Sequence, residues 1–131
     1  MNKLVNIIVI ILMTIVVTSL QSQNVTVKCV NKTGFLLDSL NLNGKFIGQL
    51  KNDSASQIIK FDNITIDSGI IPIIGIKAYI ENRLITKTKM PYHCATSWKR
   101  VTEGYYIFYI NYNKRIEEEY LSMALYDKIK R

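Results

Sequence analysis

The sequence predicts an all-β protein, a single antiparallel β-sandwich of about seven or eight short strands that follows an N-terminal signal helix. Two observations predict this fold class. Short runs in which apolar and polar residues alternate recur along the chain, and turn residues separate them about every eight to twelve positions. The aromatic and β-branched run from Gly104 to Tyr112 is bracketed by turn residues, which is typical of a central strand.

The first residues have the layout of a secretory signal. An apolar run from Leu4 to Val17 follows a basic residue, and the small residue Ser22 lies shortly after it. The run is about 14 residues long, whereas a transmembrane helix needs about 20. We therefore expect residues 1–22 to be a cleaved signal peptide and residues 23–131 to be the domain of a secreted or periplasmic protein. The alternative is a protein that stays anchored in the membrane by residues 4–20.

The domain is expected to open with a strand followed by a hairpin. Residues 25–29 alternate apolar with polar side chains, and residues 31–34 form a turn. A second strand is expected from about residue 36 to 42. Asn43-Gly44 then predicts a two-residue type I′ turn, because both of its positions need positive φ. The chain returns as a strand over residues 45–50.

Isoleucine-rich segments predict the next strands. Residues 56–61 and 64–66 fit short strands. Pro72 cannot donate to a central ladder, so a longer strand is expected to begin after it, near residue 73, and to run to residue 80. After a reversal, the chain is expected to continue as a strand over residues 84–89.

The last third is expected to contain a long loop and the two longest strands. Residues 90–102 are expected to form a long irregular connection. In the central strand, alternate residues are assigned to the core: Tyr106, Phe108, Ile110 and Tyr112. Residues 118–127 have the composition of a helix, but their apolar residues alternate strictly. We interpret this segment as a strand that covers the edge of the central one.

Two cysteines in an exported chain predict one disulfide, between Cys29 and Cys94. The chain-entropy model gives such a bridge about 4 kcal/mol of stabilisation. The alternatives are two free buried thiols or one reactive thiol. His93 beside Cys94 suggests a thiol-dependent enzyme as a second hypothesis, although neighbouring side chains in a strand point to opposite faces.

No pattern for a metal site or a cofactor is present. His93 is the only histidine, and no cysteine pair has metal-ligand spacing. The glycines do not form a phosphate-binding motif. The sequence therefore favours a protein that is not an enzyme and needs no cofactor.

The formal net charge of +7 favours acidic partners: an anionic glycan, the envelope surface or an acidic protein. Tyrosines and basic residues could together form a stacking platform for nucleic acid, but an exported protein has little access to it. We expect a binding or interaction module that uses the loop before the central strand. Its candidate contact residues are Trp98, Lys99, Arg100, Lys87, Lys89 and His93. Trp98 could alternatively plug the core beneath that loop.

One short motif resembles a known family. Tyr92-His93-Cys94, 65 positions after Cys29, is similar to the tyrosine-x-cysteine of immunoglobulin domains. The similarity stops there, since Leu40 to Asn43 occupy the place of the family's tryptophan and Met90 that of its aspartate. The resemblance implies an immunoglobulin-like or transthyretin-like sandwich architecture and no functional residues.

Overall fold

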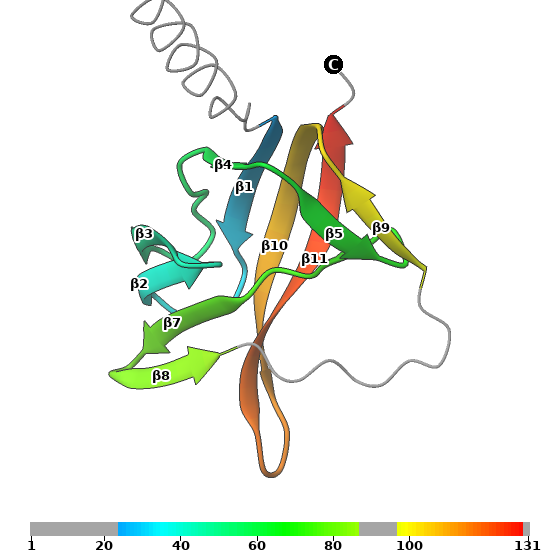
Figure 1. The fold of residues 1–131 in the computed structure, drawn as a ribbon. Coiled ribbons are helices and arrows are strands. Elements are labelled where there is room, and N and C mark those ends of the chain that lie inside the picture. The colour runs from blue at the N-terminus through cyan, green and yellow to red at the C-terminus, as the bar shows by residue number, and fades with distance from the viewer. Residues whose placement is uncertain (1–23, 87–96, 130–131) are drawn as a thin grey trace, which may run out of the picture.

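The computed structural model describes residues 24–86 and 97–129, and this part of the chain is all-β (Figure 1). Its strands form three sheets, with the orders β11-β10-β1-β4 (sheet A), β3-β2-β7-β8 (sheet B) and β6-β5-β9 (sheet C). The strands are β1 (Val25–Asn31), β2 (Leu37–Leu42), β3 (Lys45–Leu50), β4 (Ile59–Phe61), β5 (Ile64–Asp67), β6 (Ile71–Pro72), β7 (Ile76–Ile80), β8 (Arg83–Thr86), β9 (Trp98–Val101), β10 (Gly104–Lys114) and β11 (Glu119–Ile129).

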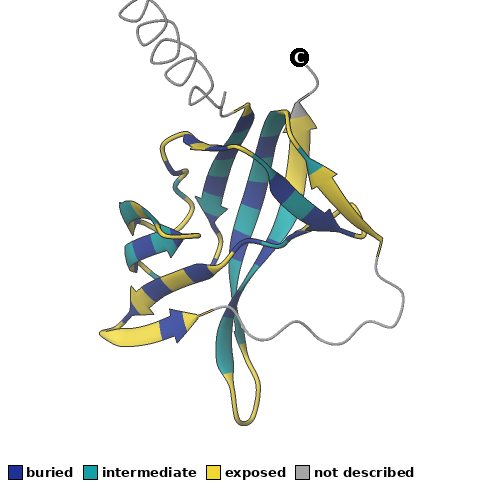
Figure 2. Ribbon diagram, viewed as in Figure 1, coloured by how far each residue is buried: buried dark blue, intermediate teal, exposed yellow. Residues whose placement is uncertain are grey.

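Sheets B and C lie against one face of sheet A (Figure 1). Strand β11 contacts β6, β7 and β8, and the Leu125 N–H donates to the carbonyl of Ile70 at 2.7 Å. Buried side chains from all three sheets form one hydrophobic core, and Figure 2 shows their alternation along the strands. Fully buried examples are Val27 and Phe108 from sheet A and Leu40 from sheet B. The other face of sheet A points away from this core.

The prediction of an all-β fold is confirmed, as are its clearest elements. Strand β10 buries Tyr106, Phe108 and Ile110, and Tyr112 packs against the core from a partly buried position. Residues 119–129 are a strand and not a helix, antiparallel to β10. The predicted hairpin turn has φ of 48° at Asn43 and 82° at Gly44 and leads into β3 over the expected residues.

Four predictions of strand position or direction are wrong. β1 pairs with β10 in parallel, not antiparallel, because the segment between them is a long crossover that contains all the described strands of sheets B and C. Pro72 belongs to the short strand β6, which lies at the edge of sheet C, where the missing N–H of proline is tolerated. The longer strand expected after it, β7, begins only at Ile76. β4 is confined to residues 59–61. Residues 98–101, expected in a loop, form β9.

Eleven strands are present in the described residues, more than the seven or eight expected, and the two-residue strand β6 and the four-residue strand β9 are the ones at unexpected positions. The predicted signal helix and the candidate residues Lys87, Lys89, His93 and Cys94 lie outside the described residues.

Candidate interaction surface on strand β9

Strand β9 carries the three candidate contact residues that the structure describes. It pairs antiparallel with β5, so that Trp98 lies opposite Asp67 and Val101 opposite Ile64. Ile64 is buried and Val101 packs against the core, which holds the strand in place. In the described part of sheet C, β9 is an edge strand.

The side chains of Trp98, Lys99 and Arg100 are all exposed. Trp98 has an exposed fraction of 62%, which excludes the alternative that it plugs the core. Neither Lys99 nor Arg100 forms an ion pair with an acidic residue in the described ranges. The structure therefore brings these three residues together, on an edge strand instead of the expected loop.

Cys29 has no disulfide partner among the described residues, and it is fully buried on the core face of β1. Its backbone is fixed by Ser56, whose hydroxyl accepts from the Cys29 N–H at 3.0 Å and whose N–H donates to the Cys29 carbonyl at 2.7 Å. Burial raises the pKa of the Cys29 thiol to about 12. The predicted partner Cys94 is not described, so the bridge and the thiol-enzyme hypothesis stay predictions.

In a Cys94→Ser variant, we expect Cys29 to resist alkylation while the protein is folded. Burial blocks access, and a pKa of about 12 leaves about one thiol in ten thousand ionised at pH 8. Mass spectrometry after iodoacetamide treatment should show no adduct in buffer and one in guanidinium chloride. Fast labelling of the folded variant would contradict the burial. Wild-type protein denatured without reductant provides the second test, because a disulfide would leave no thiol to alkylate.

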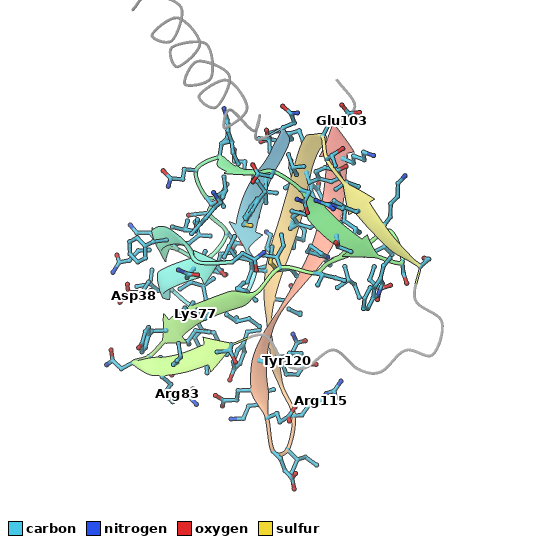
Figure 3. All side chains as sticks on the ribbon, in the orientation of Figure 1. Asp38, Lys77, Arg83, Glu103, Arg115 and Tyr120 are labelled. Carbon is cyan, nitrogen blue, oxygen red and sulfur yellow. The ribbon has the colours of Figure 1, made fainter. Side chains whose placement is uncertain are left out.

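An ionic cluster joins sheet B to the β10–β11 hairpin. Arg83, at the start of β8, forms a salt bridge with Glu119 of β11, and Lys114 of β10 lies 3.4 Å from the same carboxylate. Hydrogen bonding from Arg83 holds the pKa of the Glu119 carboxyl below its usual value. Figure 3 shows Arg83 beside this hairpin and Arg115 near its tip. The cluster therefore connects two sheets.

A shallow hollow at the tip of the hairpin is lined by residues 115–118, and Ile116 there is fully exposed. This hollow is too open to enclose a ligand.

The tyrosines and basic residues that could have formed one platform are spread over three sheets. Lys77 is exposed on β7 of sheet B, whereas Arg100 belongs to sheet C. Tyr105 and Tyr109 lie on β10 of sheet A, on the face opposite its buried residues. Lys28 of β1, next to that tyrosine row, escaped the sequence analysis, because only the pairing of β1 with β10 brings it there.

No group of three or more potential metal-ligating side chains occurs in the part of the chain that the structure describes. Among the same residues, no helix is long and apolar enough to span a membrane. No protein-family model, curated protein or solved structure matches the chain.

Proposed function

We propose that the chain is an exported, non-catalytic interaction module with β-sandwich architecture, and that it binds an acidic partner protein through β9. The observation that carries this proposal is the exposure of Trp98 on an edge strand, beside two basic side chains without acidic partners in the described residues. Solvation of a large indole ring brings no benefit to the free domain, whereas tryptophan is enriched among the residues that dominate binding energy.

Strand β9 offers a partner both backbone hydrogen-bonding groups and basic side chains. An edge strand presents backbone donors and acceptors to a further strand, so an extended acidic segment can add to sheet C. Lys99 and Arg100 then provide positive charges for its carboxylates, and the excess of basic over acidic residues in the chain steers such a segment toward the domain. The sandwich architecture is supported by a common core shared by sheet A with sheets B and C. Export is supported by the signal-like composition of residues 1–22.

Trp98 is the only tryptophan, so its fluorescence reports directly on β9. We expect emission typical of a solvated indole that acrylamide quenches efficiently. Poly-L-glutamate should shift the emission to the blue and reduce quenching, and about 0.5 M salt should reverse both changes by screening. Poly-L-lysine should have no effect.

Two double variants of equal charge change complete this test. Lys99→Glu with Arg100→Glu should weaken poly-L-glutamate binding at least tenfold, about 1.4 kcal/mol. Lys51→Glu with Lys77→Glu, at exposed positions outside sheet C, should weaken it much less. An unchanged emission spectrum on addition of poly-L-glutamate, or equal losses in the two variants, would refute the proposed role of β9.

A further inference from the structure

The outer face of sheet A carries a row of half-buried aromatic and aliphatic side chains that the core does not use. Alternation along β10 places Tyr105, Ile107 and Tyr109 on this face, opposite the buried residues of the same strand. Tyr105 and Tyr109 are four residues apart, which corresponds to about 13 Å along an extended strand. The row is therefore long enough to contact several units of an extended polymer.

A row of basic side chains lies beside the tyrosine row. The parallel register of β1 with β10 places Lys28 next to Ile107, and β4 places Lys60 next to Thr26 on the same face. Neither lysine forms an ion pair with an acidic residue in the described ranges. On the opposite flank, Asp127 of β11 is the Cα partner of Ile107, and its carboxylate accepts from the backbone N–H of Lys128 at 2.7 Å. Positive charge is therefore concentrated on the β1–β4 side.

Two stacked tyrosines complete the face. The ring of Tyr126 lies over that of Tyr109, with centroids 4.3 Å apart and an interplanar angle of 15°. The register between β10 and β11 shifts next to Ile107, which leaves Tyr126 as the extra residue of a bulge with 61% of its surface exposed. The amine of Lys32 also lies over Tyr109, 5.6 Å from its centroid, and is paired with Asp53 at 2.7 Å. Tyr126 is thus the ring of this pair that remains open for stacking.

We propose that the outer face of sheet A binds a linear acidic polysaccharide. The extended strands of this face can run alongside an extended chain, and the open ring of Tyr126 can stack on a sugar ring. The tyrosine hydroxyls and Thr26 can exchange hydrogen bonds with sugar hydroxyls. Lys28 and Lys60 supply charge-assisted hydrogen bonds to the repeated carboxylates. This site is separate from β9, which lies in sheet C.

Single-stranded nucleic acid fits the same face less well. Sequence-independent binding of single strands uses several aromatic rings on which successive bases stack. Here the ring of Tyr109 is covered by Tyr126 and Lys32, which leaves fewer open ring faces than such a platform needs. Hydroxyl groups and lysines dominate instead, which suits a sugar polymer with acidic groups.

The test is affinity gel electrophoresis of the full domain with polygalacturonate as the probe and dextran as the neutral control polymer. Polygalacturonate should retard the protein and dextran should not. Tyr126→Ala, and separately Lys28→Glu with Lys60→Glu, should each weaken polygalacturonate binding at least tenfold. Lys51→Glu with Lys77→Glu, which changes the net charge equally, should weaken it less than threefold. Thermal unfolding of each variant shows that loss of binding is not loss of fold.

Trp98→Ala distinguishes this site from β9, and it should bind polygalacturonate as the wild type does. Loss of polygalacturonate binding in this variant would show that the polysaccharide binds at β9 and not on sheet A. This outcome would overturn the site on sheet A whatever the result with poly-L-glutamate. Equal losses of affinity in the two lysine double variants would show that binding depends only on net charge, and would also overturn the site on sheet A. Equally strong retardation by poly-dT, weakened by the same substitutions, would replace polysaccharide with single-stranded nucleic acid. Retardation by dextran would contradict the requirement for acidic groups.

Discussion

Replacement of Phe108 by alanine is expected to lower the free energy of unfolding by about 4 kcal/mol. The side chain is fully buried on β10, between Cys29 of β1 and Leu125 of β11, and its ring stacks with that of Tyr106 at a centroid distance of 6.2 Å. Truncation removes the transfer energy of the ring and leaves a cavity that strands held by ladder hydrogen bonds fill only in part. Domains of this size are stable by about 5–15 kcal/mol, so the loss is a large fraction of the total.

Urea unfolding measures this loss as a lower midpoint with an unchanged slope. Ile107→Ala is the matched control, because Ile107 is the adjacent residue on the same strand and its half-buried side chain points to the other face. We expect it to cost about 1 kcal/mol. Equal losses for the two variants would contradict the assignment of the two faces of β10.

The two faces of β10 could be predicted from the sequence because their signal is local. Alternation decides which side chains point inward as soon as the strand is recognised, and Asn43-Gly44 specifies its hairpin through the φ values that these two residues tolerate. Residues 119–129 illustrate the same point, since alternation in this segment predicted the strand correctly against a helix-like composition.

The direction of the β1–β10 pair could not be predicted in this way. An alternating pattern is the same when it is followed in either direction, so it identifies the inward residues of β1 without deciding whether the partner strand is parallel. That decision depends on the crossover and on how sheets B and C pack. The lysine row beside Tyr105 and Tyr109 is a consequence of the pairing of β1 with β10 and β4, which the sequence did not predict either.

Strand β9 was missed for a different reason. Of its four residues, only Val101 packs against the core, so no alternation is visible from Trp98 to Arg100. The strand exists because β5 provides a ladder partner more than 30 residues earlier in the chain. Sequence analysis selected Trp98, Lys99 and Arg100 as candidate contact residues from their chemistry but assigned them to a loop, whereas they lie on a strand.

The burial of Asn31 was also missed, since residues 31–34 were predicted only as a turn. Its amide N–H groups donate to the carbonyls of Phe35 and Leu50, each at 2.8 Å. Its side-chain oxygen accepts from the backbone N–H and the hydroxyl of Thr33, at 2.9 and 2.7 Å. Asn31 is fully buried, and it ties the end of β1 to the following turn and to the end of β3. The asparagine two residues before a threonine is a signal that could have indicated this turn.

Asn31→Ala is therefore expected to cost about 3 kcal/mol, because four side-chain hydrogen bonds are lost at about 1 kcal/mol each and water can replace only part of them. The melting temperature should fall by on the order of 10 °C, measured by circular dichroism. Asn52→Ala is the matched control: its side-chain oxygen accepts from the Gly34 N–H at 2.8 Å, but in an exposed position, and its loss should cost less than about 1 kcal/mol. Equal melting temperatures for the two variants would contradict the buried hydrogen-bond network.

Asn31→Asp separates hydrogen bonding from side-chain volume. It preserves the shape and the two acceptor contacts, but it removes both donors and places a carboxylate opposite the carbonyls of Phe35 and Leu50. Burial and the facing carbonyls disfavour the charged form, so the pKa of the introduced carboxyl should be higher in the folded than in the unfolded state. Such a group is tolerated best below its unfolded pKa, and it destabilises the fold increasingly as the pH rises through the folded pKa. The stability deficit of this variant relative to wild type should therefore be larger at pH 7 than at pH 4, whereas that of Asn31→Ala should not change with pH.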